Sequence, residues 1–205
     1  MSDELKLLNP VSYPPREDWD RRLSTIGCPD LAPVTTLHEN EWFSVRNRGG
    51  YFTTEYNLSQ VVVLPIVDDT NIVMIRVKRP VIGDTTLELP AGAIEHGESP
   101  VAGAARELSE ETGIVIPQAR LKAMAPMAPS PNRMPNLIYV FRVDLSRAEF
   151  DRRKPHDNEV ESVHCLSFQE VMRLVAEGSL YVALPIAVVA SYLFARPPLS
   201  TLKEK

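Results

Sequence analysis

The feature that most constrains this chain is a group of glutamates, Glu107, Glu110 and Glu111, near the end of one predicted helix. The pattern predicts a helix over residues 100–112, because a serine–proline pair opens it and Gly113 follows it. At i, i+3, i+4 spacing the carboxylates share one face, where like charges cost roughly 0.2–0.5 kcal/mol per pair. They also meet the negative end of the helix dipole. A divalent cation would relieve both effects, and oxygen ligands suit Mg2+ or Mn2+.

Other polar residues of the same segment fit a supporting role. Arg106 precedes Glu110 by four residues and can bridge to it and to Glu98, which would orient the acids around a cation. Gly92 and Gly97 suit a tight loop that leads into the helix. The alternative is a solvated acidic helix face stabilised by Arg106, which is the commoner meaning of an isolated E-x-x-E-E run.

The complete pattern decides between these alternatives. Residues 92–114 read G-x5-E-x7-R-E-U-x-E-E-x-G-U, where U is aliphatic, and this resembles the signature of the Nudix hydrolases at every fixed position. A chance match in a chain of this size is below about one in a million. The order of strands and helices over roughly residues 40–195 looks like the same family. The resemblance therefore implies a metal-dependent hydrolase.

The resemblance also implies roles for the residues of the signature. Nudix enzymes use water to cleave the pyrophosphate of a nucleoside diphosphate linked to another group. Glu107 and Glu111 would be the catalytic metal ligands. Glu110 would either bind the metal or contact one of its ligands, and Glu98 and Arg106 would orient these acids. The ion, usually Mg2+ with Mn2+ as an option, neutralises phosphate charge and activates the water.

Two segments before the signature narrow the substrate. Arg79-Pro80 and the run from Leu87 to Gly92 look like the branch that hydrolyses ADP-ribose and other nucleotide sugars. That branch implies that the backbone carbonyl of Ala91 also binds metal and that Arg79 contacts the substrate phosphates. An ordinary surface arginine beside Lys78 is the alternative. The expected products are AMP and ribose 5-phosphate.

A further carboxylate often serves as general base in this branch. It comes from a loop after the strand that follows the signature, and the segment from Asp157 to Val163 matches that pattern loosely. Glu159 is our candidate and Glu161 the second choice, while an ordinary polar loop is the alternative. A base must reach the attacking water at roughly 2.6–3.2 Å.

The first part of the chain is expected to pair two copies into a homodimer. By resemblance, residues 1–57 form an arm and a small β subdomain for dimerisation and contact with the substrate base, and residues 58–205 form the hydrolase domain. Trp42 is our candidate for stacking on adenine, with Tyr51 and Phe52 as other options. A core position is the alternative for Trp42, since aromatic residues in strands are more often core residues.

The hydrophobic pattern predicts an α/β protein with a mixed sheet and helices on both faces. This agrees with the α/β/α sandwich of the Nudix fold, extended by a small N-terminal β subdomain. The run from Asn47 to Gly50 signals a hairpin turn, and that from Ser167 to Glu170 has the form of a capping box. The predicted strands are 41–46, 51–56, 61–66, 72–77, 87–89, 137–143 and 160–166, and the helices are 18–24, 100–112, one from Ser167 to Gly178 and one from Pro185 to Ala195.

Charge and composition argue against several other classes. The net charge is −5 without a basic stripe, which argues against RNA decapping and other nucleic-acid binding. A non-catalytic nucleotide-sugar sensor would usually have lost acids of the signature, and this chain has them all. The apolar stretch 180–195 is shorter than the roughly 20 residues of a membrane span.

Two further features bear on compartment and substrate. Cys28 and Cys165 are far apart and read as reduced thiols, which favours a cytoplasmic protein. The proline-rich segment 125–136 is expected to be a loop, and it lacks the acid expected there in an ADP-ribose hydrolase. Another nucleoside diphosphate sugar, linked to GDP or UDP, therefore stays open as a substrate.

Glu111→Gln is expected to remove most of the activity while leaving the fold intact, because the substitution removes the charge and keeps the shape. Turnover in Mg2+ and the circular dichroism spectrum of the variant test this together. Normal turnover by the folded variant would contradict the assignment of Glu111 as a metal ligand.

Overall fold

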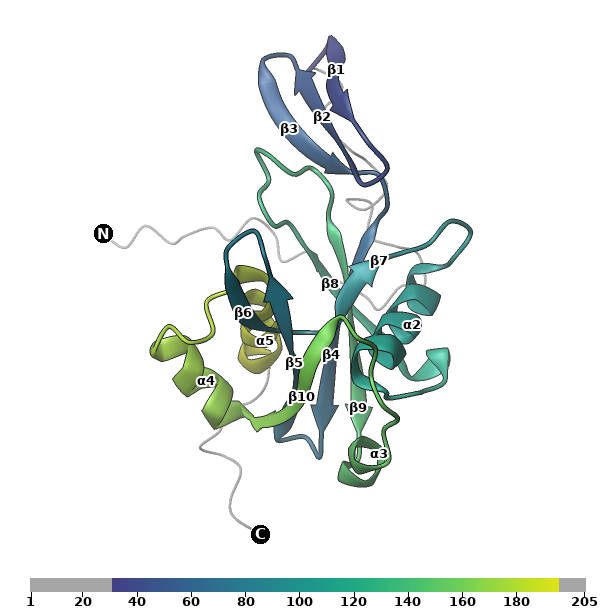
Figure 1. Cartoon of the computed structure of the whole chain (residues 1–205), viewed down its shortest axis with the longest axis vertical. Coiled ribbons are helices and arrows are strands. Elements are labelled where there is room, and N and C mark those ends of the chain that lie inside the picture. Colours follow the sequence, from purple (N-terminus) through teal and green to yellow (C-terminus); the bar gives the residue numbers. More distant parts are fainter. Residues whose placement is uncertain (1–30, 196–205) are drawn as a thin grey trace, which may run out of the picture.

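Two separate sheets form the described part of the chain (Figure 1). The computed structural model describes residues 31–195, and the helix expected near residues 18–24 lies outside this range. The smaller sheet is antiparallel in the order β1-β2-β3. Its β2–β3 connection is the predicted hairpin turn, where the Gly50 N–H donates to Asn47 Oδ1 at 2.7 Å. The strands are β1 (Val34–Glu39), β2 (Phe43–Arg48) and β3 (Tyr51–Tyr56).

The larger sheet is mixed. Its order is β10-β5-β4-β9-β8, with β6 paired to β5 and β7 paired to β4. Strands β4 and β9 are parallel, and the other pairs are antiparallel. The strands are β4 (Gln60–Val67), β5 (Asn71–Arg79), β6 (Asp84–Glu88), β7 (Ala91–Ala93), β8 (Lys122–Met127), β9 (Ile138–Leu145) and β10 (Val160–Ser167).

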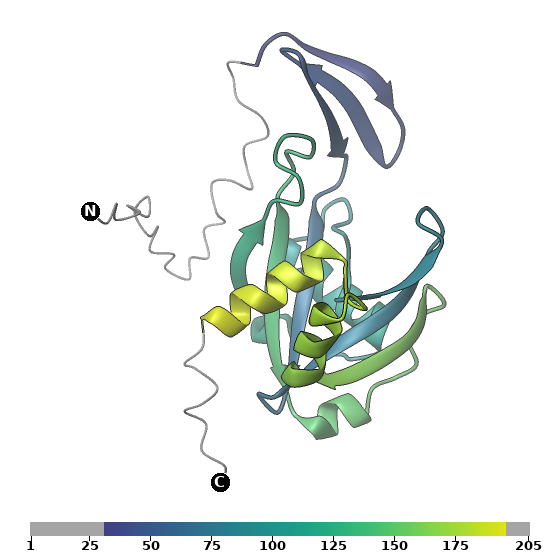
Figure 2. The same cartoon turned by 90° about the vertical axis from the view of Figure 1, so that its left-hand side faces the viewer.

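Helices cover both faces of this sheet, as predicted (Figure 2). Side chains of the central strand β4 alternate between the faces. Val61 and Val63 pack in the core beneath α2, whereas Val62 and Leu64 pack in the core beneath α4 and α5. The helices are α2 (Pro100–Thr112), α3 (Arg147–Asp151), α4 (Phe168–Ala176) and α5 (Ala183–Phe194), and a 3-10 turn spans Gln118–Arg120.

Helix α2 begins and ends as its sequence predicts. The Ser99 hydroxyl accepts from the Ala102 N–H at 3.2 Å, and a proline occupies the first turn. Gly113 adopts a left-handed φ of 72°, and its N–H donates to the Ser109 carbonyl. The loop before β10 then pairs with this end, where the Lys154 N–H donates to the Gly113 carbonyl at 2.9 Å. Gly113, a fixed position of the signature, therefore both ends α2 and joins it to the loop before β10.

Several element boundaries differ from the prediction. The last helix begins at Ala183, two residues before Pro185, because proline is compatible with the first turn of a helix. The strand expected at 87–89 spans 84–88 and pairs with β5. The strand expected from Glu41 begins at Phe43. Strand β8 was not predicted, and its last three residues lie in the segment expected to be a loop, because Pro126 obscures the strand pattern and the register with β9 shifts there.

The proline-rich segment also joins the two sheets. The Thr54 N–H donates to the Arg133 carbonyl at 2.7 Å, and Arg133 Nη1 donates to the Phe52 carbonyl at 3.1 Å. The Asn136 side chain accepts from the Tyr56 N–H at 3.0 Å and donates to the Tyr56 carbonyl at 3.2 Å. These bonds cover the outer edge of β3, so the segment acts as a partial fourth strand of the small sheet.

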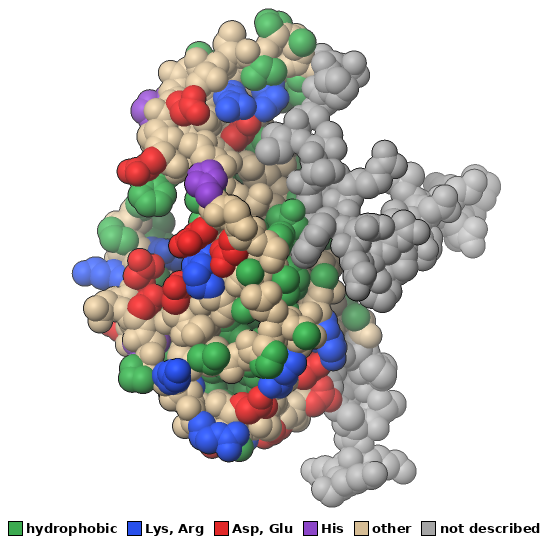
Figure 3. Space-filling model, turned by 90° about the vertical axis from the view of Figure 1, so that its right-hand side faces the viewer, with side chains coloured by type: hydrophobic (Ala, Val, Ile, Leu, Met, Phe, Trp, Pro, Cys, Tyr) green, Lys and Arg blue, Asp and Glu red, His purple; other side chains and the backbone are tan. Residues whose placement is uncertain are grey.

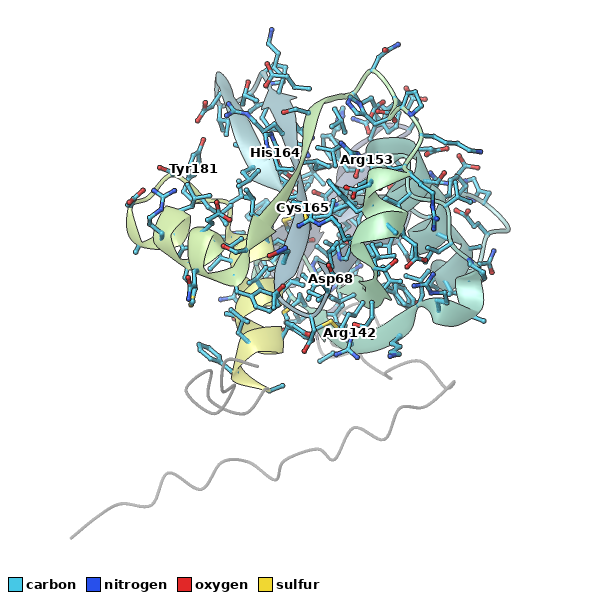
Figure 4. The ribbon with its side chains drawn as sticks, turned by 90° about the horizontal axis from the view of Figure 1, so that it is seen from below. Asp68, Arg142, Arg153, His164, Cys165 and Tyr181 are labelled. Atoms are coloured by element: carbon cyan, nitrogen blue, oxygen red, sulfur yellow. The ribbon has the colours of Figure 1, made fainter. Side chains whose placement is uncertain are left out.

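Cys165 is a free, half-buried thiol on β10 (Figure 4). Cys28 lies outside the described residues. No helix within residues 31–195 is long and apolar enough to cross a membrane.

Gly113→Ala is expected to lower the free energy of unfolding more than Gly178→Ala does. Both glycines have a left-handed φ, of 72° and 76°, which costs an alanine roughly 1–2 kcal/mol. A Cβ on Gly113 would also overlap the Lys154 carbonyl, whereas one on Gly178 has open space. The overlap should add about 1–3 kcal/mol, measured by urea unfolding. Equal losses in the two variants would contradict this account.

Candidate active site

Helix α2 presents two of its glutamates to strand β7. Glu107 and Glu111 are only 9% and 7% exposed. The Ala91 N–H donates to Glu111 Oε2 at 2.8 Å. A Cβ on Gly92 would overlap the Glu107 carboxylate, so glycine is required at this position by the close approach of the acid. The Pro-Ala-Gly turn and the glutamates of the signature therefore form one site.

Arg106 connects the acids of the signature to each other and to β7. It donates to Glu107 Oε1 at 2.8 Å, to Glu110 Oε2 at 2.9 Å and to Glu98 Oε2 at 3.1 Å. It also donates to the Ala93 carbonyl at 2.7 Å. Seen from the side of α2, acidic side chains gather around a basic one below the small sheet (Figure 3). Arg106 thus holds three carboxylates together, and these ion pairs keep the pKa of Glu98 low.

Burial makes the charged forms of Glu107 and Glu111 unfavourable. The pKa of Glu111 is raised to about 8, mainly by burial and also by the negative charges of Glu107 and Asp157, while the Ala91 N–H and Arg79 act in the opposite direction. Burial also raises the pKa of Glu107, although Arg106 opposes this shift. Two partly desolvated carboxylates side by side need a positive partner to stay ionised.

The residues present fit a divalent cation. The available donors are carboxylate and carbonyl oxygens, which suit Mg2+ or Mn2+. Within residues 31–195, no three His, Cys, Asp or Glu side chains already form a complete metal cluster. Glu110 lies on the solvent side, where its side chain is 49% exposed and pairs with Arg106. Glu107, Glu111 and a main-chain carbonyl of β7 are the donors that could hold the ion together with water.

The two candidates for the general base lie in different surroundings. Glu159 immediately precedes β10, and its charge acts on both Glu107 and Arg79. Glu161 is exposed and pairs with Arg76 at 3.5 Å. The charge of Glu159 thus reaches the buried Glu107, whereas Glu161 is paired with Arg76 on the surface.

The loop that carries Glu159 is fastened to the end of α2. The Asp157 N–H donates to the Glu110 carbonyl at 2.8 Å, and Asp157 Oδ1 accepts from the Glu159 N–H at 3.0 Å. Free carbonyls at the helix end thereby find partners. The sequence did not indicate this role of Asp157, since a helix cap supplied from 47 residues away along the chain has no local pattern.

Arg79 and Trp42, the two residues predicted to bind substrate, differ in their position relative to the acids of α2. Arg79 lies near the site, where it pairs with Glu88 through Nε at 2.8 Å and Nη2 at 2.9 Å. Trp42 lies in the bend before β2 and is 68% exposed, so the alternative of a core position is wrong. No hydrogen bond or ring contact joins Trp42 to α2 or β7 within the described residues. A base-stacking role for Trp42 therefore stays a prediction.

Comparisons with known proteins agree with this geometry. A model of the NUDIX domain matches residues 57–184. An ADP-ribose pyrophosphatase of Bacillus subtilis (strain 168) is 29% identical over 143 residues, covering 70% of this chain and 76% of that protein. An ADP-sugar pyrophosphatase of Mus musculus is 32% identical over 126 residues, 58% of each chain. A crystal structure of an ADP compounds hydrolase superposes with a TM-score of 0.62 at 19% identity, covering 83% of this chain and 95% of that one.

Glu111 should make the stability of the metal-free protein depend on pH. Its pKa is raised from 4.5 to about 8 in the folded state, so the stability it contributes when protonated is lost as the pH rises through about 8. Glu111→Gln stays neutral, and its stability relative to the parent should rise by a few kcal/mol between pH 5 and pH 9, at roughly 1.4 kcal/mol per pKa unit.

Urea unfolding in EDTA at the two pH values measures this difference. Mg2+ at pH 9 should restore the stability of the parent protein and leave Glu111→Gln unchanged. A stability difference that is the same at both pH values would contradict the buried carboxyl.

Proposed function

Since the chain belongs to the Nudix family and is a Nudix pyrophosphohydrolase, we propose that it hydrolyses ADP-ribose to AMP and ribose 5-phosphate with Mg2+. The observation that carries this proposal is the buried pair Glu107 and Glu111 against β7, with Arg79 beside it. Nudix hydrolases use divalent ions, and Mn2+ could replace Mg2+ in this oxygen-rich site.

Each residue of the site has one task in this proposal. Glu107, Glu111 and the Ala91 carbonyl hold the ion, and Glu110 completes the acidic face on the solvent side. A divalent ion bound there would neutralise phosphate charge and lower the pKa of water. Arg79 binds a phosphate oxygen, and Glu159 accepts the proton of the attacking water.

Arg106 and Glu98 serve the same reaction indirectly. Arg106 keeps Glu107 and Glu110 in one orientation, and Glu98 keeps Arg106 in place through two of its nitrogens. Such support sharpens a metal site without direct contact to the ion.

The choice of ADP-ribose rests on two supports. The Arg79 and Pro-Ala-Gly segments match that branch, and the B. subtilis and mouse relatives carry names for the hydrolysis of ADP-ribose and ADP-sugars. Another nucleoside diphosphate sugar is the alternative, because segment 125–136 uses Arg133 and Asn136 to bind β3 and contains no acid. A non-catalytic sensor is a second alternative, and the complete set of acids disfavours it.

We also propose a cytoplasmic homodimer, built through residues 1–57, with the hydrolase domain at 58–205. The exposed side chains of the small sheet support the pairing of two copies. Polar side chains such as Glu55 are buried in this sheet, and Arg48 donates to Glu55 at 2.6 Å. Large apolar side chains lie outside instead, and a second copy would cover them. They are Val34, Leu37, Trp42, Tyr51, Phe52 and Tyr56. Trp42 is our candidate for contact with adenine.

Release of phosphomonoester from ADP-ribose, GDP-mannose, UDP-glucose, NADH and dinucleoside polyphosphates tests this function. We expect Mg2+-dependent cleavage that is fastest on ADP-ribose and absent in EDTA. Glu177→Gln, which alters only an exposed pair with Arg173 on the surface near α4, is the control that keeps full activity. Fastest cleavage of another sugar nucleotide would contradict the branch. No cleavage of any compound by folded protein in Mg2+ would contradict the enzymatic function.

A further inference from the structure

The Arg79 side chain extends along the β5–β6 hairpin to contact the Glu88 carboxylate. The register of β5 and β6 places Arg79 opposite Asp84, and Glu88 opposite Ile75. At about 3.3 Å per residue, the backbone positions of Arg79 and Glu88 are separated by roughly 13 Å along the strands. Their side chains nevertheless form two hydrogen bonds, of 2.8 and 2.9 Å. The arginine side chain therefore lies back along the hairpin, away from its tip and toward the Pro-Ala-Gly turn.

The partner carboxylate is itself held in place. The Thr86 hydroxyl donates to Glu88 Oε1 at 2.6 Å, and Thr86 is 2% exposed. The Glu88 side chain is 14% exposed, against 47% for Arg79. Burial opposes the charge of Glu88, but the hydrogen bonds from Arg79 and Thr86 outweigh it and leave its pKa below the ordinary value. Glu88 is thus a buried anion with two hydrogen-bond donors, and Arg79 is the more exposed partner of the pair.

The geometry of this pair leaves Arg79 able to bind a phosphate. A guanidinium has five N–H donors, and the pairing with Glu88 uses Nε and one hydrogen of Nη2. The three others have no partner among residues 31–195, and two of them, one on each terminal nitrogen, form the edge that matches two oxygens of a phosphate. The charges of Glu111 and Glu159 also act on Arg79, so the guanidinium lies within electrostatic range of one buried acid of α2 and of the candidate base.

We propose that Glu88 is a positioning residue, held by Thr86, which fixes the Arg79 guanidinium so that its free edge faces the pyrophosphate of the substrate. This inference rests on the proposed function for the identity of the substrate. Glu88 does not touch the substrate, and it acts only through Arg79. Without Glu88, the arginine side chain would spread over many rotamers, and binding of the phosphate would have to order it again.

A double-mutant cycle on Glu88 and Arg79 tests the proposal. Glu88→Gln keeps the size of the side chain but faces Arg79 with an N–H2 group. It should lower kcat/KM by about 10- to 100-fold, the size expected for a charged hydrogen bond. KM should rise several-fold, because binding of the phosphate is weakened. In an Arg79→Ala background the same substitution should change kcat/KM less than about twofold.

Two further variants separate positioning from a general loss of structure. Thr86→Val should produce a smaller loss in the same direction, about 2- to 10-fold, because it frees the carboxylate without removing it. Glu177→Gln should leave both constants unchanged, because it removes an exposed carboxylate from a pair distant from β6 in the chain. An unchanged KM in Glu88→Gln, or an equal loss in the Arg79→Ala background, would overturn the proposal.

A measurement without substrate keeps this inference separate from the proposed function. The 1H–15N signal of Arg79 Nε, assigned by its loss in Arg79→Ala, should be protected from solvent exchange in the parent protein and exchange rapidly in Glu88→Gln. Equal exchange in both proteins would overturn the pairing. If the parent cleaved none of the sugar nucleotides, the proposed function would fail while this signal still showed whether Glu88 holds Arg79.

Discussion

The contact between helix α2 and the short strand β7 is the interaction on which the rest of the structure depends. Two carboxylates, Glu107 and Glu111, are buried at this contact, and each is matched to a backbone position of β7. Arg106 donates to Glu107 and the Ala91 N–H donates to Glu111, but burial still disfavours the charged forms and raises both pKa values. A divalent cation bound between them would stabilise the charged forms of both. In the metal-free protein the negative charge of these two acids is therefore unfavourable, and binding of a cation would stabilise it.

The surrounding elements bring the candidate base and a cationic side chain, Arg79, toward the buried acids. The loop before β10 binds the end of α2 and brings Glu159 toward the buried acids, while the β5–β6 hairpin brings Arg79 from the other direction. These segments are far apart in the sequence, and they meet because both β10 and β6 pair with β5. One strand thus aligns the candidate base and the candidate phosphate-binding residue. The acids of α2 lie against β7, which pairs with the neighbouring strand β4.

Local patterns predicted the parts of the fold that local forces determine. The caps of α2, the hairpin at Asn47, the buried strand β4 and the capping box at Ser167 were all visible in the sequence. Strand β7 was not, because three residues carry no periodicity and their pairing with β4 is a tertiary contact. Within the site, the signature indicated the acids. The pairing of Arg79 with Glu88 was missed because it runs diagonally across two strands.

Crystals of the protein grown with Mn2+ and measured at the manganese absorption edge would test the central claim most directly. Our account predicts an anomalous peak in contact with carboxylate oxygens of both Glu107 and Glu111 and with the Ala91 carbonyl. Mn–oxygen distances of about 2.0–2.3 Å would be expected for such a hard-ligand site. A peak elsewhere on the molecule, or one held only by the exposed Glu110, would contradict it.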